Sequence, residues 1–421
     1  MESDGRVRRR LSVMMVLVYS VQGAFWPLLS IHLVDLGVAE RGRGWIFATM
    51  ALGSFAVPMG AGQLVDRLMP TQRFLSISFG AGTVLLALMG SGVTSNAGGM
   101  FGLFLAYWLI MSPNYSLSSS IAFRNLARPD RDFGKVRLWG TVGWMASGWL
   151  VSGVMAWSGS RSGRGTPEAF WVAVGLSGAT ALYCRFLPDT PPIKAPGNRK
   201  SWARDVSDLV RSPSMGVYLL AAFGVSLTTP FVYQVMPNYL RAIGMDRAWV
   251  GTAMTLGQWP EIAALAALPW LIGRYGYRAT LGLGIAAYLV RYGMLALDPS
   301  VWLATAGIPL HGIGVACFTI GGQMFVDGRA PADRRASAQS LNTVVTGGLG
   351  SLLGSLLAGE VVAAFPGRFG MIFLVPCAIN ASLLAFLLLM FRPTIAAPQP
   401  PDVPVRPPAV EPTARPVSAG G

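Results

Sequence analysis

The chain has 421 residues, of which 52% are hydrophobic and only 12% are charged. A soluble protein would carry roughly a quarter charged residues, so the composition excludes an ordinary soluble protein and indicates an integral membrane protein. The net charge of +14 does not indicate nucleic-acid binding. The basic residues cluster in short segments between apolar stretches, which leaves no soluble basic domain for that function.

The chain begins with a basic segment, residues 1–10, that runs directly into an apolar stretch at residues 11–36. This stretch is too long for the apolar region of a signal peptide and lacks a clear cleavage site, so we predict a transmembrane helix there. Further apolar segments of bilayer-spanning length follow. They lie at residues 44–65, 74–93, 100–122, 136–157, 168–187, 213–240, 248–272, 277–297, 301–326, 336–362 and 370–391, which makes twelve predicted transmembrane helices.

A hydrophilic stretch, residues 188–212, divides these segments into six plus six. We therefore predict an all-α membrane protein with two pseudo-symmetric six-helix bundles, at residues 1–187 and 213–392, as in transporters built from repeats. Residues 188–212 would form a cytoplasmic linker. Residues 393–421 are Pro-rich without an apolar period, and we expect a disordered cytoplasmic tail there.

The distribution of basic residues sets the expected orientation. Of the 33 Lys and Arg residues, 25 fall on the side that would hold both termini and seven fall on the other side. Basic loops stay in the cytoplasm, so we expect both termini there. The protein is thus expected to be a multi-pass protein of the cytoplasmic (inner) membrane, with the lipid bilayer as a partner, and to be a monomer.

A short motif occurs after the second apolar segment and again, incompletely, after the eighth. The first copy, GQLVDR at residues 62–67, resembles the G-x-x-x-D-R signature of the major facilitator superfamily, whereas the second, PWLIGR at residues 269–274, lacks the acid. Asp66, Arg67 and Arg73 are the predicted gating residues, because an acid at a helix end beside bases can hold two helices together in one transport state. The motif and the twelve segments predict the major facilitator fold.

One acid, Glu261, lies within an apolar segment, residues 249–272, that carries no other charge before its end. An ionisable group at that depth is costly and indicates a functional site. Gln258 lies three residues earlier and shares a helix face with it. The alternative is a hydrogen-bonded pair between helices that binds no ligand. In an apolar surrounding the carboxyl of Glu261 is expected to favour its protonated form.

Other polar side chains also lie within the predicted helices. Arg137 shares a face with Thr141 and Trp144, four and seven residues later, although it could instead extend its side chain to the membrane surface. His311 could equally face a pocket or be a hydrogen-bonded core residue. For Arg291 we expect a structural partner.

Three further polar residues are expected to join helices by hydrogen bonds: Gln323, Gln339 and Asn342.

No catalytic set is evident. The chain has two histidines, His32 and His311, and three cysteines whose spacing matches no metal or redox motif. Neither a Ser-His-Asp arrangement nor a phosphate-binding glycine loop is present. We therefore expect no enzyme activity, no cofactor and no metal.

Several segments resemble bacterial nucleoside:proton symporters, a major facilitator family. The run RLWGTVGW at residues 137–144 is similar to that family's R-[IL]-W-G-T-[IV]-G-[FW], and RASAQ at residues 335–339 is similar to its R-A-S-A-Q. The Q-x-x-E at residues 258–261 and R-Y-G at residues 274–276 also fall in register. The resemblance covers roughly residues 11–392.

This resemblance implies a set of substrate-binding residues. Arg137, Thr141 and Trp144 would correspond to the family's base and ribose contacts, with Trp in place of the usual Phe. Gln258 and Glu261 would match its polar pair on the eighth helix, with Glu261 also coupling the proton.

The seventh and tenth helices match less closely. Gln234 is the candidate on the seventh helix, with Asn238 behind it. On the tenth, a Tyr, a Phe and an Asp of the nucleoside permeases are replaced by His311, Val315 and Ala316. His311 is kept as a candidate for substrate binding and for relaying the proton, because imidazole titrates near neutrality. Glu261 would then be the remaining membrane carboxylate for proton coupling.

The resulting hypothesis is proton-coupled nucleoside uptake by alternating access, with a nucleoside and protons as partners. Trp144 would stack on the base, and protonation of Glu261 would remove a buried charge so that the loaded carrier can reorient. One alternative is a transporter of another small solute, such as a sugar, an aromatic acid or a drug-like compound, possibly working as an exporter. Another is a membrane sensor or scaffold without transport. A membrane enzyme is disfavoured because a catalytic set is missing.

Overall fold

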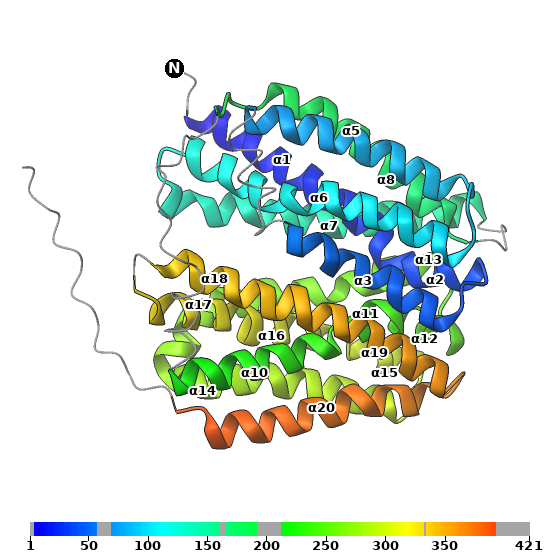
Figure 1. Ribbon diagram of the computed structural model, residues 1–421, viewed down its shortest axis with the longest axis vertical. Coiled ribbons are helices and arrows are strands. Elements are labelled where there is room, and N and C mark those ends of the chain that lie inside the picture. Colours follow the sequence, from blue (N-terminus) through cyan, green and yellow to red (C-terminus); the bar gives the residue numbers. More distant parts are fainter. Residues whose placement is uncertain (1–3, 57–68, 160–164, 192–211, 332–333, 393–421) are drawn as a thin grey trace, which may run out of the picture.

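The computed structural model describes residues 4–56, 69–159, 165–191, 212–331 and 334–392. Regular structure within these ranges is entirely helical, which confirms the all-α class (Figure 1). Two of the predicted gating residues, Asp66 and Arg67, lie outside the described residues, as do most of the predicted linker and the tail. Some described helices follow one another directly along the chain, and we call each such run, or each single long helix, a rod. The described rods correspond to the twelve predicted segments.

The described residues of the first half form six rods. Its first rod is interrupted at Pro27, because proline removes a backbone donor and restricts the preceding turn. The helices are α1 Asp4–Phe25, η1 Trp26–Leu28 and α2 Leu29–Asp35 in that rod, then α3 Glu40–Ala56, α5 Thr71–Gly90, α6 Ala97–Asn125, α7 Pro129–Ser158, and α8 Pro167–Tyr183 with η3 Cys184–Phe186.

The rods of the second half are more often interrupted. The seventh is split at Pro230 and Pro237 into α10 Pro213–Thr228, α11 Pro230–Gln234 and α12 Met236–Ala242. The remaining helices are α13 Arg247–Met254, η4 Thr255–Gly257, α14 Gln258–Ala296, α15 Val301–Ala306, α16 Pro309–Gly314, η5 Val315–Ile320, α17 Gly321–Arg329, α18 Arg335–Thr343, η7 Val344–Gly350, α19 Ser351–Ala364 and α20 Phe369–Met390.

Two predicted segments differ from expectation in their ends or continuity. The first helix begins at Asp4, seven residues before the predicted start at residue 11, because the basic N-terminal arm continues the helix. The eighth and ninth segments share the assigned helix α14, in which the chain reverses at Gly276. The backbone there has φ 75° and ψ 170°, a conformation that glycine adopts without a steric cost.

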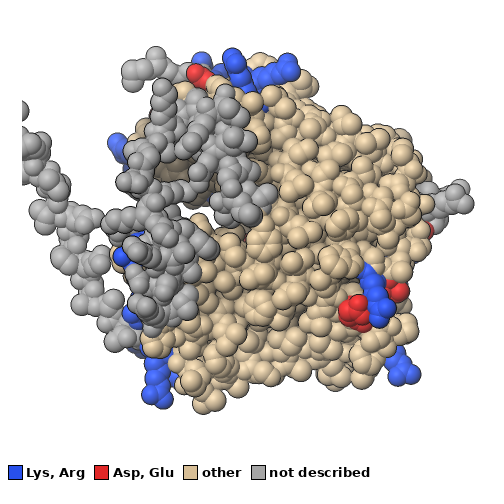
Figure 2. Space-filling model, viewed as in Figure 1, with Lys and Arg blue, Asp and Glu red and all other residues tan. Residues whose placement is uncertain are grey.

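Length and composition support a membrane location for most of these rods. Eight described helices or helix runs are long and apolar enough to cross a membrane. Helices α6 and α7, with 29 and 30 residues, are also long enough but carry more polar residues. On the face shown in Figure 2, charged side chains gather at the two ends of the molecule and leave an uncharged surface between them. This surface is suited to lipid.

The helices of each half pack mainly against one another. Helix α1 packs on α7 and α8, and α5 packs on α6 and α8, whereas α14 packs on α16 and α20, and α10 packs on α20 (Figure 1). The halves meet where α3 lies against α19 and where α7 lies against α13. A site between the halves is therefore bounded by helices that are far apart in sequence.

Glycines bring α1 and α7 unusually close together. A Cβ added at Gly143 would lie 2.2 Å from the carbonyl oxygen of Val16, and one added at Gly23 would lie 2.7 Å from the carbonyl oxygen of Trp144. Because backbone atoms cannot move aside like the end of a side chain, these positions exclude any larger residue. This close approach fixes the helix that carries Arg137, Thr141 and Trp144 against α1.

Replacing Gly143 with alanine should separate α1 from α7 and destabilise the protein by about 1–3 kcal/mol, the range for overpacking a tight interface. Thermal unfolding of the purified protein would show this as a lower midpoint. Gly153→Ala is the matched control, because Gly153 lies on the same helix with no other atom within 4 Å of an added Cβ. Equal midpoints for the two variants would contradict the proposed packing constraint.

Candidate transport site

A chain of polar and aromatic side chains links three helices of the first half. The guanidinium carbon of Arg137 on α7 lies 4.1 Å from the centre of the Tyr19 ring on α1. The Tyr19 ring lies 5.3 Å from that of Tyr115 on α6, whose hydroxyl donates to Gln22 Oε1 at 2.6 Å. The cation–π contact and the hydrogen bond hold Arg137 toward the bundle interior rather than toward lipid. This arrangement favours the functional interpretation of Arg137 over extension to the membrane surface.

A second polar group surrounds the start of α14. Gln258 is buried, with Oε1 lacking a hydrogen-bond partner among the described residues, and Glu261 one turn later is half-buried. Helix α16 approaches this turn at Gly312, where an added Cβ would lie 2.5 Å from the amide nitrogen of Glu261. The neighbouring His311 is thereby held close to Glu261's helix. Neither Gln258 Oε1 nor His311 Nδ1 is satisfied by the described protein groups, so the predicted hydrogen-bonded core arrangement is not observed for these atoms.

Arg291 lies within electrostatic range of His311 and is 1% exposed. The expected structural partner is not found for its Nε and Nη1 atoms, which have no hydrogen-bond acceptor among the described residues. Tyr233 and Tyr288 lie within electrostatic range of both Arg291 and Glu261. Both tyrosines therefore share the surroundings of a buried cation and of the membrane carboxylate.

The two polar groups face each other across the halves. Arg137 on α7 is close enough to Glu261 on α14 for its positive charge to act on the carboxylate. Thr141 and Trp144 lie on the same helix as Arg137 and, like it, are half-buried. Arg137 and Glu261 are thus within electrostatic range of each other, and a substrate site shared by the two residues stays a prediction.

Three other predicted residues lie elsewhere. Gln234 and Asn238 line a pocket at the end of the molecule where α2 and α12 end. We call this end the opposite face, because it is opposite to the end where α1 begins. Gln234 Nε2 donates to the carbonyl oxygen of Ser355 at 3.3 Å. The remaining predicted gating residue that the structure describes, Arg73, is exposed at the start of α5.

The polar residues expected to join helices do so. Gln339 Nε2 donates to the carbonyl oxygen of Gln323 at 2.8 Å, linking α18 to α17. The hydroxyl of Tyr218 on α10 donates to Asn342 Oδ1 at 3.1 Å. These contacts confirm the structural interpretation of Gln339 and Asn342, whereas Gln323 takes part through its backbone carbonyl.

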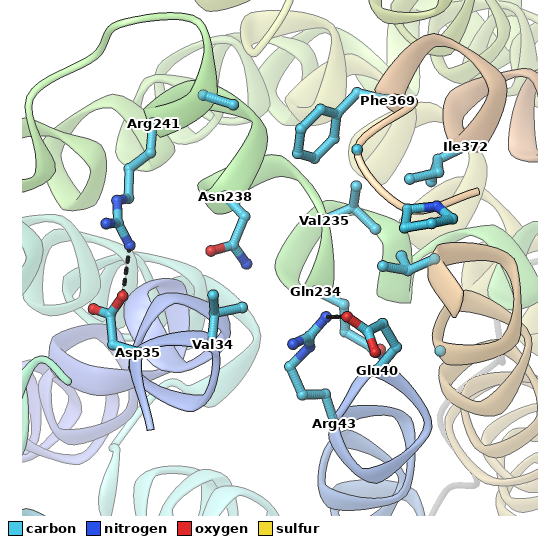
Figure 3. Close-up of a pocket in the computed structure, with 15 residues that line it drawn as sticks. Val34, Asp35, Glu40, Arg43, Gln234, Val235, Asn238, Arg241, Phe369 and Ile372 are labelled. Atoms are coloured by element: carbon cyan, nitrogen blue, oxygen red, sulfur yellow. Dashed lines mark hydrogen bonds and ion pairs between the residues drawn. The ribbon is translucent and has the colours of Figure 1, made fainter. Parts of the chain in front are cut away.

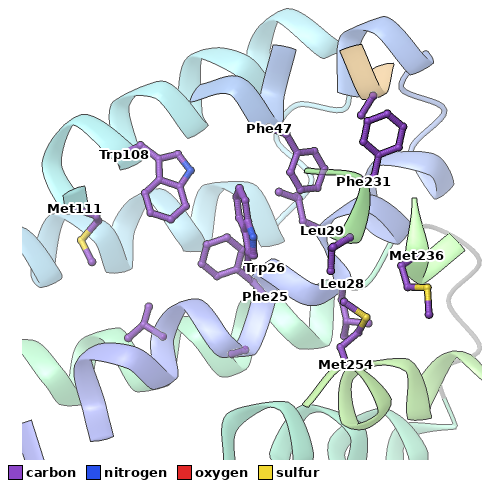
Figure 4. Packing of buried hydrophobic residues seen from close by; sticks show 14 of the residues in the cluster. Phe25, Trp26, Leu28, Leu29, Phe47, Trp108, Met111, Phe231, Met236 and Met254 are labelled. Carbon is purple, nitrogen blue, oxygen red and sulfur yellow. The ribbon is translucent and has the colours of Figure 1, made fainter. Parts of the chain in front are cut away.

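An apolar layer separates the central residues from the opposite face. Trp26 of η1 is 5% exposed, and its ring centre lies 5.0 Å from that of Phe47, 5.3 Å from that of Trp108 and 6.2 Å from that of Tyr233. In Figure 4, Leu28 and Leu29 lie beside side chains of the second half, including Met254. This layer joins the two halves and closes the path toward the opposite face.

Ion pairs reinforce the closure. Asp35 at the end of α2 accepts a hydrogen bond from Arg241 Nη1 at 3.0 Å on one carboxylate oxygen, and its other oxygen forms an ion pair with Arg247 Nη2 at 3.0 Å. The Asp35 side chain is 11% exposed. A second pair between the halves, Arg41 with Glu360 at 3.0 Å, is exposed and contributes little. The boundary between the two halves, which we call the seam, also contains a hydrogen bond from the indole of Trp149 to the hydroxyl of Thr255, at 3.0 Å.

Sequence reasoning missed Tyr19, Tyr115 and Asp35. The tyrosines lie in apolar helices, where aromatic residues ordinarily fill space, and their contacts with Arg137 depend on helix packing. Asp35 lies at a predicted helix end, where acids are common. An acid at one such end and bases at the ends of helices in the other half could have indicated a pair, but not which bases.

Comparison with known proteins now identifies the family. A family model described as "Nucleoside H+ symporter" matches residues 6–395. The chain belongs to the nucleoside H+ symporter family. Such proteins are transporters, so the expectation of a non-enzyme holds.

Curated relatives and solved structures agree with this assignment. The symporter is 32% identical over 363 residues to the putative nucleoside transporter YegT of Escherichia coli K12, covering 84% of each chain. It is 22% identical to the nucleoside permease NupG of the same organism, over 85% of this chain and 88% of the relative. A crystal structure of a NupG point mutant superposes with a TM-score of 0.82 at 21% identity, covering 92% of this chain and 100% of that one, which confirms the major facilitator fold.

Asp35→Asn should open the opposite face more often, because it leaves two cations of the second half without their carboxylate. We expect labelling of Ser152→Cys, a buried position on the seam, by an impermeant maleimide to rise about tenfold, equivalent to about 1.4 kcal/mol. Glu360→Gln, which breaks the exposed pair, is the matched control and should change labelling little. Unchanged labelling in Asp35→Asn would exclude Asp35 as a latch.

Proposed function

We propose that this nucleoside H+ symporter takes up a nucleoside together with a proton, through a site between Arg137 on α7 and Glu261 on α14. The observation that supports this assignment is that the positive charge of Arg137, on a helix of the first half, acts on the carboxylate of Glu261 in the second half. A site divided between the bundles can be exposed to either side of the membrane as the bundles move, which alternating access requires.

The residues around this site suit a nucleoside. The indole of Trp144 offers an aromatic face for stacking on the base, a contact that every base can make. The unpartnered Oε1 of Gln258 can accept a hydrogen bond from a base amino group or a ribose hydroxyl. Thr141 and Arg137 supply a hydroxyl and a guanidinium on the facing helix. A bound nucleoside would thus satisfy polar atoms that the described protein leaves unpaired.

Glu261 is the proposed proton carrier. When ionised, its carboxylate is attracted by Arg137 in the other half and carries a charge that is costly within the membrane. Proton binding removes both the charge and this attraction, so protonation frees the halves to move relative to each other. The proton and Arg137 therefore compete for the same carboxylate, which couples protonation to conformation. His311, on the helix packed against Glu261, is the proposed relay.

We further propose that the protein is a monomer in the cytoplasmic membrane, with both termini in the cytoplasm. The excess of Lys and Arg on the side of the termini supports this orientation. In this orientation the opposite face is the outer one. The apolar layer and the Asp35 ion pairs then close the outer side in this structure. The division of the apolar segments into six plus six supports residues 1–187 and 213–392 as the two moving bundles.

Glu261→Gln should abolish uptake driven by a proton gradient, because the amide cannot gain or lose the coupled proton. Exchange of labelled for unlabelled uridine across proteoliposomes should persist, since exchange needs no net proton movement. Both rates can be measured on the same preparation. Undiminished accumulation at an imposed pH gradient would exclude Glu261 as the proton carrier.

Glu360→Gln serves as the control carboxylate, because the Glu360 side chain is exposed and pairs with Arg41. Competition by adenosine, uridine and maltose tests the solute itself. Maltose is included because a maltose permease of Geobacillus stearothermophilus is 25% identical over 384 residues. Competition by maltose but not by nucleosides would overturn the nucleoside assignment.

Trp144→Ala should weaken nucleoside binding by the free energy that stacking of one base contributes, about 1–3 kcal/mol. This loss raises Kd roughly 5- to 150-fold. Trp144→Phe retains an aromatic face and should bind nearly as tightly as the native protein. Calorimetric titration with uridine measures both variants. If both bind alike and weakly, the indole has a role other than stacking.

A further inference from the structure

A pocket of about 430 Å³ opens at the opposite face, beyond the apolar layer (Figure 3). It is built from both halves: α2 and α3 supply one wall, and α11, α12, α19 and the start of α20 supply the other. Its volume falls within the range of small-molecule sites. Because η1 and its aromatic neighbours lie between, this pocket is separate from the residues around Glu261.

The charges of the pocket are balanced. Two carboxylates and two guanidiniums line it, and each carboxylate is paired: Arg241 with Asp35 at 3.0 Å, and Arg43 with Glu40 at 3.1 Å. A wall without net charge does not favour a strongly anionic or cationic ligand. It does present many hydrogen-bond donors and acceptors, which suits a neutral, polar solute.

Two further side chains point to a ligand with a flat heterocycle. Asn238 is half-buried, and its amide makes no hydrogen bond to any residue that the structure describes. Figure 3 shows this amide directed into the pocket between Arg241 and Val34. Phe369 lines the same pocket and is held by Tyr239, whose ring centre lies 5.2 Å away. An aromatic surface and an amide directed into the same pocket match the π-face and the polar edge of a nucleobase.

We propose that this pocket is a second nucleoside-binding position at the outer mouth of the transporter, occupied before the central site. This inference rests on the proposed function for the solute and for the orientation. The base would lie against Phe369 with its edge on the amide of Asn238, and the ribose hydroxyls would donate to the carboxylate of Glu40. The ligand class is a neutral nucleoside rather than a nucleotide, since both guanidiniums of the wall are already paired with carboxylates and neither is left over for a phosphate.

The same pocket connects ligand binding to the closure of the outer side. Arg241 lines it and also holds Asp35, which ties α12 to α2 across the halves. A nucleoside oxygen that accepts a hydrogen bond from Arg241 competes with Asp35 for that guanidinium. Binding at the outer position therefore weakens the latch that blocks the way to the central site.

Equilibrium dialysis of the purified full-length protein against tritiated uridine tests this proposal. The native protein should bind two uridines per chain. The double variant Gln258→Ala with Glu261→Gln removes the central site and should retain one. Adding Asn238→Ala or Phe369→Leu to that background should weaken the remaining binding at least tenfold. Two pocket variants are used so that a folding defect in one leaves the other informative, and Glu360→Gln is the neighbouring control.

Two results would overturn the outer site: one uridine per native chain, or residual binding in the central-site variant that neither pocket substitution weakens. Proton-driven uridine uptake is measured on the same preparations. Uptake with a single binding site would refute the outer position and leave the proposed function standing. Two uridines bound without any uptake would refute the proposed function and support the outer position as a nucleoside site.

Discussion

A carboxylate in an apolar membrane helix must be either protonated or faced by a cation, and the arrangement of this transporter follows from that requirement. Glu261 can meet it in two ways, by taking a proton or by attraction to Arg137 in the other half. In the proposed mechanism, protonation frees the halves and attraction to Arg137 draws them together. One carboxyl group would then couple the movement of the proton to that of the solute.

This mechanism depends on close helix packing. Gly143 lets α7 approach α1 so that Arg137 lies over the ring of Tyr19. Gly312 lets α16 approach the turn that carries Glu261, with His311 beside it. Both approaches bring backbone against backbone, so each polar side chain is held by a rigid support. The facing charges can therefore change their separation only through movement of whole bundles.

The polar residues form two sets with different electrostatic character. The central set holds Arg137 and the buried Arg291 near a single titratable carboxyl, and its net charge changes with protonation. The outer pocket balances two carboxylates with two guanidiniums at about 3 Å and has no such excess. An apolar layer around Trp26 separates them. A neutral solute can occupy either set, whereas the proposed proton coupling belongs to the central one.

The sequence by itself determined the helical segments, the basic bias of one side and the depth of Glu261, because hydrophobic length and charge density are local properties. Family motifs also predicted Arg137 and Glu261 as partners in one site, and the two residues lie within electrostatic range of each other. Only the tertiary structure decided that Tyr19 and Tyr115 support Arg137 and that Asp35 pairs with Arg241 and Arg247. It also decided that Asn238 faces an outer pocket. The contacts of Asp35 join residues more than 200 positions apart, and the packing of two bundles, not local pattern, determines which helix faces meet.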